Sequence, residues 1–221
     1  MPQAVIFDVD GTLVDSVDLH ARAWADTFRH FGHDVPFDEV RAQIGKGADQ
    51  LMPVFLSRRE LDEKGDEIET FRTDLYKRDH LGKVRGFPNV RELFEALRAR
   101  GRRLLLASSA KGDELETYVR VAGIDGLFDD ATTSEDADRS KPHPDIFAAA
   151  LEKAGLPPSA AVVVGDTPYD AEAAVKAGIT PIGVRSGGFP VEDLRGAGCV
   201  EIWDGPADLL RNLDRSLIGQ G

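Results

Sequence analysis

Cysteine is almost absent from this sequence. Cys199 is the only cysteine among 221 residues, so the chain cannot form an internal disulfide. The segment Met1–Asp8 lacks the basic start of a signal peptide and runs directly into a strand pattern. Together these two absences favour the cytoplasm as the location of the protein. We interpret Cys199 as a small buried apolar side chain, because it lies in an apolar stretch.

Long apolar runs and basic clusters are also missing. The longest apolar stretches, such as Leu104–Ala107 and Ala160–Val164, are far shorter than a membrane span. The formal net charge is −12, and no basic run interrupts it. We therefore expect no nucleic-acid and no membrane partner, and no sequence feature indicates an oligomeric state. If the chain binds an anion, a metal cation and a well-placed lysine must reverse the charge locally.

The sequence does contain a regular alternation of strand and helix patterns. Short apolar runs predict buried parallel strands, and amphipathic stretches between them predict helices. The predicted strands are Ala4–Phe7, Arg103–Ala107, Ala161–Val164, Pro181–Val184 and Cys199–Ile202. The predicted helices between and after them are Asn89–Arg100, Glu114–Ala122, Pro144–Lys153, Tyr169–Ala177 and Pro206–Leu213. This alternation predicts an α/β fold with a Rossmann-like, doubly wound parallel sheet.

One long segment contains helix patterns only. They cover Asp18–Phe31, Phe37–Ile44, Asp49–Phe55 and Glu60–Asp79. We interpret residues 16–84 as an all-helical cap domain inserted into a catalytic core of residues 1–15 and 85–221. Such an insert would lie over the carboxyl edge of the sheet, where open α/β folds bind their ligands.

Two carboxylates follow the first predicted strand. That strand ends at Asp8, and Asp10 comes two residues later, so in extended chain the two side chains share a direction. Gly11 allows the tight turn that follows. Unpaired, the two carboxylates would raise each other's pKa. A hard divalent cation such as Mg²⁺, which prefers oxygen ligands, resolves this conflict.

Polar residues with a possible chemical role occur at three other places in the predicted fold. Ser108 and Ser109 end the strand at Arg103–Ala107, Lys141 stands before a helix, and Asp166 and Asp170 follow the strand at Ala161–Val164. Singly, Ser108 reads as a helix N-cap and Lys141 as a solvated charge. Acids at the ends of buried strands are costly when they have no partner, which makes a chance combination improbable.

At these residues the sequence resembles the haloacid dehalogenase superfamily, in particular its phosphatases with a helical cap. The segment Asp8–Ser16 matches the family's first motif, Asp-x-Asp-Gly-Thr-Leu-x-Asp-Ser, at every fixed position. Ser108 matches the second motif, Lys141 the third, and Gly165-Asp166-x-x-x-Asp170 the fourth. The resemblance covers essentially the whole chain.

The resemblance implies a role for each of these residues. Asp8 attacks phosphorus and forms an aspartyl-phosphate, and Asp10 protonates the leaving oxygen and then activates water. Mg²⁺ is held by the Asp8 carboxylate, the Asp10 backbone carbonyl and Asp166, with Asp170 behind them. The remaining groups implied at the phosphate are Ser108, Ser109, Lys141 and the backbone N–H groups at Gly11 and Thr12. The implied substrate is a small phosphorylated metabolite.

Related activities differ at single residues. Dehalogenases of the superfamily lack the second aspartate, so Asp10 favours phosphate esters. Phosphonatases carry a cap lysine where this chain has Ala48, although Lys46 is near. Sugar phosphomutases of the β-phosphoglucomutase type are the closest alternative, because His20 and Trp24 resemble the start of their cap. Against them, Gly165 stands where those mutases have glutamate. A non-catalytic binding module is a further, less favoured alternative.

We expect the cap to contact the leaving group and so to determine which substrates the enzyme accepts. His20 either contacts Asp10 or the substrate, or is a hydrogen-bonded interface residue, and we interpret Trp24 as core packing. Lys46, between Gly45 and Gly47, is either a mobile cation for the substrate or a solvated lysine. Arg22 is a further candidate for this surface.

Overall fold

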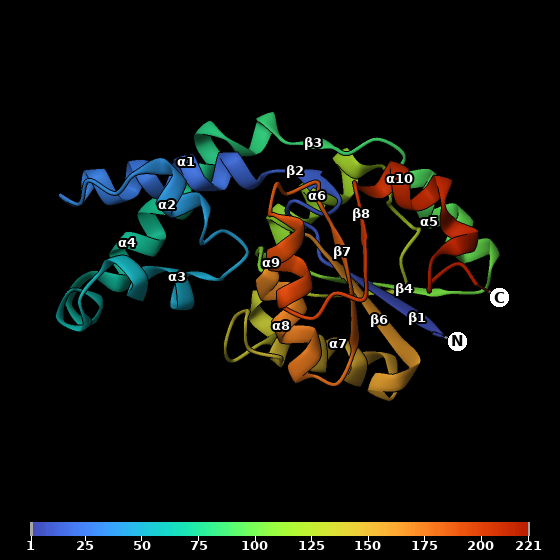
Figure 1. Cartoon of the computed structure of the whole chain (residues 1–221). Coiled ribbons are helices and arrows are strands. Elements are labelled where there is room, and N and C mark those ends of the chain that lie inside the picture. Colours follow the sequence, from blue (N-terminus) through green and yellow to red (C-terminus); the bar gives the residue numbers. More distant parts are fainter. Residues whose placement is uncertain (1, 221) are drawn as a thin grey trace.

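A parallel sheet forms the centre of the computed structural model, which describes residues 2–220 (Figure 1). Six strands lie in the order β5-β4-β1-β6-β7-β8. Their bounds are β1 Ala4–Phe7, β4 Arg103–Ala107, β5 Asp130–Thr132, β6 Ala161–Gly165, β7 Thr180–Val184 and β8 Glu201–Trp203. The predicted α/β class with a Rossmann-like doubly wound sheet is confirmed.

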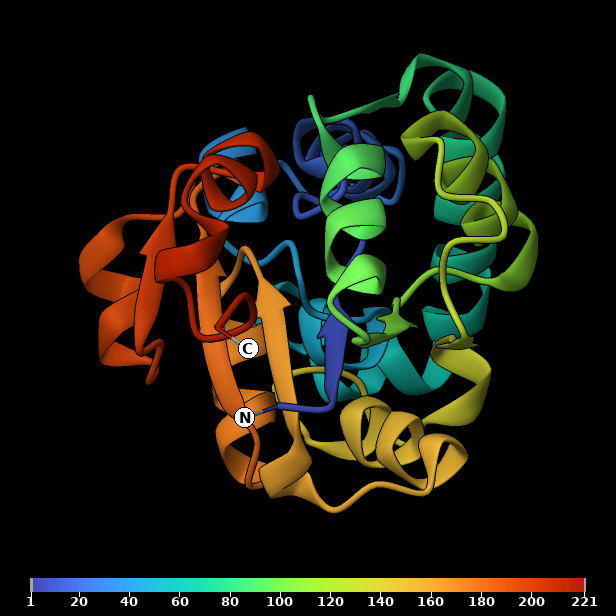
Figure 2. The same ribbon diagram turned by 90° about the vertical axis from the view of Figure 1, so that its right-hand side faces the viewer.

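Helices cover both faces of this sheet (Figures 1 and 2). On one face lie α5 (Val90–Ala99), α6 (Gly112–Ala122) and α10 (Pro206–Arg211), packed on Val5 and Phe7 of β1. On the other face lie α7 (Asp145–Ala154) and α8 (Pro168–Lys176), packed on Ala4 and Ile6. Successive strand residues point to opposite faces, so a strand covered on both sides must be apolar throughout, as β1 is.

A helical unit, called the cap below, lies between β1 and β4 in the sequence. It contains α1 (Val17–His30), α2 (Phe37–Arg41), α3 (Ala48–Phe55) and α4 (Arg58–Asp79), and it has its own apolar cluster around Trp24 and Phe28. The chain enters through β2 (Val14–Asp15) and leaves through β3 (Arg85–Gly86), which pair antiparallel. The two connections therefore lie side by side. Among residues 2–220, no helix is both long and apolar enough to cross a membrane.

Several short elements differ from the sequence prediction. β2, β3 and α9 (Val191–Gly196) are too short to show a periodic pattern, and β5 is a polar edge strand. The last strand begins at Glu201 rather than Cys199. Cys199 is half-buried, not fully buried as predicted, and burial raises the pKa of its thiol to about 12.

Candidate active site

The site lies where the strand order reverses. β1 pairs with β4 on one side and β6 on the other, with Phe7 opposite Val164. From β1 the chain continues outward to β4 and β5, whereas from β6 it continues to β7 and β8 on the other side. A crevice opens at the carboxyl ends of the strands at such a point. Asp8 and Asp166 follow β1 and β6 into this crevice.

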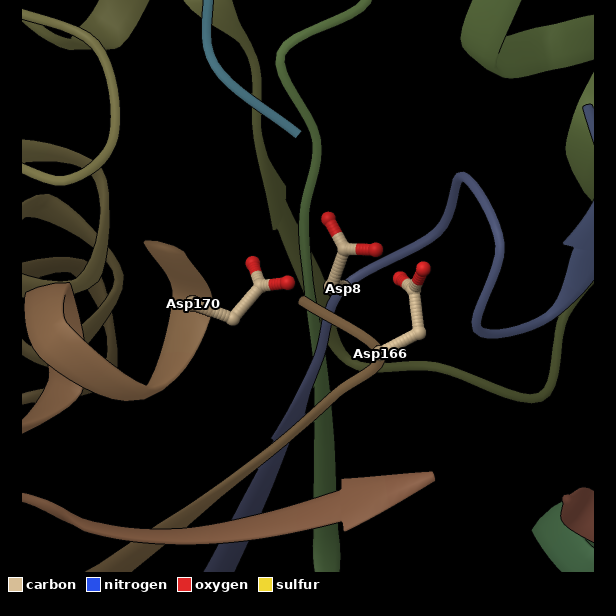
Figure 3. A group of neighbouring side chains, drawn as sticks. All are labelled: Asp8, Asp166 and Asp170. Carbon is tan, nitrogen blue, oxygen red and sulfur yellow. The ribbon is translucent and has the colours of Figure 1, made fainter. Parts of the chain in front are cut away.

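Three buried carboxylates meet there (Figure 3). One oxygen from each of Asp8, Asp166 and Asp170 lies within 4.8 Å of the others. These three residues are at most 5% exposed. Burial, the repulsion of Asp170 and, to a smaller degree, that of Asp10 raise the pKa of Asp8 to about 7, although Lys141 opposes them. Burial and the charges of Asp8 and Asp170 raise the pKa of Asp166 well above its ordinary value.

Lys141 supplies a positive charge at the centre of this cluster. Its ammonium lies 2.5 Å from Asp8 Oδ1 and 2.7 Å from Asp170 Oδ1, and the residue is 1% exposed. Burial acts to lower the pKa of Lys141, but Asp170 and Asp8 together raise it above its ordinary value. The lysine therefore stays protonated. One positive charge against three carboxylates still leaves the cluster negative.

The space beside Asp166 suits a small cation. Asp166 Oδ2 is buried and has no hydrogen-bond donor within residues 2–220. A Cβ added to Gly11 or Gly187 would overlap this oxygen, so the carboxylate keeps this position only because both residues are glycine. All the side-chain groups of the cluster are carboxylates, the ligands that Mg²⁺ prefers. These residues therefore fit Mg²⁺.

Thr12 bridges two of the carboxylates. Its hydroxyl lies 3.1 Å from Asp8 Oδ2 and 3.0 Å from Asp166 Oδ1. One hydroxyl has one proton, so it donates to only one of them at a time. The amides of Gly11 and Thr12, implied as phosphate ligands by the resemblance, donate instead to Val14 and Val9 carbonyls at 2.8 and 3.3 Å. In this conformation they are not available to a phosphate.

The Asp10 carboxylate lies outside the cluster of three. Its Oδ1 accepts from Ser16 Oγ at 2.7 Å and lies 2.9 Å from His20 Nε2. Ser108 Oγ is 3.5 Å from its Oδ2. Burial acts to raise the pKa of Asp10, but His20 and Ser16 hold it below its ordinary value. The side chain of Asp10 thus faces the cap rather than the other three aspartates.

His20 of the cap contacts Asp10, and its hydrogen bonds define its tautomer. Arg72 Nη2 lies 2.5 Å from His20 Nδ1. A guanidinium has only donors, so Nδ1 must accept and Nε2 carries the proton that is donated to Asp10. The His20 ring stacks on Tyr76 with centroids 4.0 Å apart, and Tyr118 Oη is 3.1 Å from Nε2. Arg72 and Tyr118 were missed by sequence analysis, because no motif marks residues this far apart in the chain.

A cavity of about 500 Å³ separates the cap from the core. Asp8, Asp10, His20 and Ser109 line it. Ser108 is buried beside it and accepts a hydrogen bond from the Ala110 amide at 3.1 Å. A concave site of this size suits a small molecule.

The predicted cap residues are divided between the cavity and other contacts. Lys46 lines the cavity, but its ammonium is 2.6 Å from Gln43 Oε1 and 4.7 Å from the centre of the Tyr169 ring. The Arg22 guanidinium lies over Phe37 instead. Trp24 packs in the cap's apolar cluster, as predicted, with its edge on the cavity.

Three polar contacts hold the other side of the cap on the core. Arg41 Nη2 donates to the Gly187 carbonyl at 2.9 Å, and Tyr169 Oη donates to the Ala42 carbonyl at 2.7 Å. The Ser140 amide donates to Asp49 Oδ2 at 3.1 Å. Gly187 and Ser140 adjoin the carboxylate cluster and Lys141, so these contacts couple the cap position to the site.

Comparison with known proteins places this arrangement among relatives. Residues 5–184 match the model of the haloacid dehalogenase-like hydrolases. The chain is 29% identical over 194 residues to a putative pyrophosphatase PpaX from Caldanaerobacter subterraneus, covering 87% of this chain and 86% of that protein. It is 30% identical over 187 residues to the phosphorylated carbohydrates phosphatase of Thermotoga maritima, covering 81% of this chain and 83% of that one.

Two other similarities concern a longer protein and a solved structure. The chain is 32% identical over 189 residues, 83% of its length, to the protein SUPPRESSOR OF QUENCHING 1 of Arabidopsis thaliana, and spans 18% of that protein. A crystal structure of a hydrolase from Pseudomonas syringae superposes with a TM-score of 0.89 at 28% identity, covering 97% of this chain and 99% of that chain. The matched residues 5–184 include all three aspartates of the cluster and Lys141.

Proposed function

Because this chain belongs to the haloacid dehalogenase-like hydrolase family, we propose that it is a Mg²⁺-dependent phosphatase that transfers the phosphoryl group of a small phosphomonoester to Asp8. The observation that carries the proposal is the Asp8 carboxylate, buried between Lys141, Asp166 and Asp170 at the end of the cavity. Phosphoryl transfer needs positioning and charge neutralisation, and this arrangement supplies both.

In the first proposed step, Asp8 is the nucleophile. One of its carboxylate oxygens bonds to phosphorus, while the bond between phosphorus and the ester oxygen breaks. The electron pair goes to the leaving oxygen, which takes a proton from Asp10. Lys141, 2.5 Å from Asp8 Oδ1, neutralises charge on the nucleophile and the incoming phosphoryl group. The Ser108 hydroxyl and Ser109 bind phosphoryl oxygens.

In the second proposed step, water releases phosphate. Water attacks phosphorus and gives a proton to Asp10, the bond from phosphorus to Asp8 breaks, and the carboxylate is restored. His20 and Ser16 favour the ionised form of Asp10, which is the form this step needs. For the first step Asp10 must carry a proton, so these contacts have to loosen.

We propose that Mg²⁺ is bound by Asp8, Asp166 and the backbone carbonyl of Asp10, with Asp170 positioning Lys141 behind them. When bound, the cation neutralises charge on the phosphoryl oxygens. Asp166 Oδ2 has no hydrogen-bond donor within residues 2–220, and the pKa values of Asp8 and Asp166 are raised. Both observations support a cation here. We also propose that residues 16–84 act as a cap that closes over the cavity and excludes water.

A sugar phosphomutase is the second candidate. The contact between His20 and Asp10 favours it, because control of Asp10 by the cap would let the enzyme delay hydrolysis of its phosphorylated form. The two candidates differ in product. Release of phosphate from β-glucose 1-phosphate supports the phosphatase, and efficient isomerisation to the 6-phosphate supports the mutase.

The proposal is tested with a generic aryl phosphate. Purified protein should hydrolyse p-nitrophenyl phosphate with Mg²⁺ and lose this activity in EDTA. Asp8→Asn should be inactive while keeping the wild-type melting temperature within a few degrees. Turnover that survives in Asp8→Asn would exclude Asp8 as nucleophile. Absence of turnover for every phosphate ester would instead favour a non-catalytic binding module.

A further inference from the structure

Glu114 is a buried acid that the proposed mechanism does not use. It lies on α6 of the core, is 3% exposed, and lines the cavity. Within residues 2–220 its carboxylate oxygens have no hydrogen-bond or ion-pair partner, and they are not sealed off from the cavity. Burial raises its pKa, with Arg72 opposing the rise. A carboxylate at the cavity surface without a partner from the chain can accept hydrogen bonds from a ligand in the cavity.

Arg72 faces the same cavity from the cap. Its guanidinium contacts His20 and lies over the rings of Trp24 and Tyr76, with 5.3 and 5.2 Å between the guanidinium carbon and the ring centres. Its Nε is buried and has no acceptor in the part of the chain that the structure describes. The Glu114 carboxylate of the core and the Arg72 guanidinium of the cap thus line one cavity, and no hydrogen bond or ion pair joins these two residues.

Acidic side chains predominate among the charged residues that line this cavity. Glu69, Glu135 and Asp138 also line the cavity. Of its lysines, Lys46 is held by Gln43, and Lys111 is exposed at the rim. A second anionic group on the substrate, such as a carboxylate or another phosphate, would meet repulsion here. A neutral group that both donates and accepts hydrogen bonds would satisfy Glu114 and Arg72 together.

We propose that Glu114 and Arg72 form a hydroxyl-binding subsite and that the substrate is the phosphate ester of a neutral polyhydroxylated alcohol, a sugar or polyol phosphate. This rests on the proposed phosphatase activity. Hydroxyls of the leaving group donate to the Glu114 carboxylate, and their oxygens accept from Arg72. Substrates that lack these hydroxyls leave both groups unsatisfied, which lowers kcat/KM.

The test compares leaving groups on one enzyme. With Mg²⁺, kcat/KM for ribose 5-phosphate or glucose 6-phosphate should exceed that for phosphoglycolate and for pyrophosphate by at least about tenfold. Preference for phosphoglycolate, pyrophosphate or an aminoalkyl phosphate would overturn the inference. p-Nitrophenyl phosphate is the reference, because its hydrolysis reports the proposed function independently of this preference.

Binding to Asp8→Asn tests the subsite without turnover. Calorimetry should give a Kd for the sugar phosphate at least about tenfold below that for phosphoglycolate. The reverse order would contradict the subsite even if the enzyme turns over nothing.

One matched pair of variants tests whether Glu114 causes the preference for the sugar phosphate. Glu114→Gln should lower the ratio of kcat/KM for the sugar phosphate over phosphoglycolate by about tenfold, because it removes the carboxylate that accepts hydroxyls and repels anions. Glu116→Gln, on the exposed side of the same helix, is the control and should keep the ratio. An unchanged ratio in a folded Glu114→Gln protein would remove Glu114 from the subsite.

Discussion

At the scale of single residues, the site is governed by charges that cannot balance within the chain. Asp8, Asp166 and Asp170 are buried around one lysine, and Asp166 Oδ2 has no donor within residues 2–220. Such a cluster is unfavourable by itself, since burial disfavours each charged form. In the proposed mechanism, a cation offsets this negative charge and allows an anionic phosphoryl group to approach. The cost of the cluster in the free protein is therefore part of its ability to bind.

Gly187 tests whether the position of Asp166 Oδ2 matters for the proposed cation site. In Gly187→Ala the new Cβ would overlap Asp166 Oδ2 and displace that carboxylate. We expect kcat/KM for p-nitrophenyl phosphate to fall by at least about a hundredfold, since small misplacements cost that much. Gly82→Ala is the matched control, because a Cβ there meets nothing within 4 Å. Equal activity of the two variants would contradict the assigned role of this space.

Glu114 gives a pH dependence with a definite sign. Its pKa is raised in the folded protein, so the folded state binds its proton more tightly than the unfolded chain does. The resulting stability is present at low pH and is lost as pH rises through the folded pKa. Glutamine stays neutral, so the melting temperature of Glu114→Gln relative to wild type should increase between pH 4 and pH 8. A constant or decreasing difference would show that this pKa is not raised.

Sequence motifs singled out the residues that meet in the carboxylate cluster, but not the other charged residues that line the cavity. Asp8, Lys141, Asp166 and Asp170 stand in motifs, and parallel strands bring such residues to one edge of a sheet. Arg72 and Glu114 stand in ordinary amphipathic helices, where a charged residue is normally solvated. Their place in the cavity depends on how the cap meets the core, which no local pattern encodes.

At the scale of elements, the cap is joined to the core by apolar packing as well as by polar contacts beside the shared cavity. Ala23 of α1 and Leu75 and Tyr76 of α4 pack in the apolar cluster of the core. Other apolar residues of the four helices form their own cluster, and the paired strands β2 and β3 form the covalent connection. On the side away from His20, the contacts are those of Arg41, Tyr169 and Asp49. Polar contacts of this kind are individually weak, which is compatible with the proposed opening and closing of the cap.

Arg41→Gln tests this connection. Loss of the hydrogen bond to the Gly187 carbonyl should cost the closed cap about 1 kcal/mol. Hydrogen exchange at residues 42–49 should then be roughly fivefold faster, and KM should rise more than kcat falls. Arg58→Gln removes an ion pair on the exposed surface of α4 and serves as the control. Unchanged exchange in Arg41→Gln would show that this contact does not hold the cap.

Helices and strands were predicted most accurately where the hydrophobic pattern of the sequence is strong. β1 and β4 were predicted with correct bounds, because buried central strands are continuous apolar runs. β2 and β3 are two residues each and exist only because the two ends of the insert pair with each other. α4 begins two residues before its prediction, where Ser57 and Glu60 form a capping box.

At the scale of the whole molecule, the net charge of −12 opposes both folding and the approach of an anion. The buried Lys141 offsets part of this negative charge within the site but does not reverse it, so the proposed cation is needed as well. Acidic residues elsewhere repel one another across the surface, and salt screens this repulsion.

This charge predicts a salt response. Between 10 and 150 mM KCl the screening length shrinks from roughly 30 to 8 Å, so the melting temperature at pH 8 should rise. Near the sequence pI of about 4.9 the net charge vanishes and the rise should disappear. A melting temperature that falls with salt at pH 8 would show that attractive ion pairs outweigh the repulsion.

The covalent step on Asp8 is tested most directly by trapping it. With p-nitrophenyl phosphate the leaving group needs no proton, so Asp10→Asn should complete the first step and stall before the second. After rapid acid quench, mass spectrometry of this variant should find one phosphoryl group on Asp8, formed with a burst of nitrophenolate equal to the enzyme. Turnover with no burst, or with a phosphoryl group on any other residue, would contradict the account.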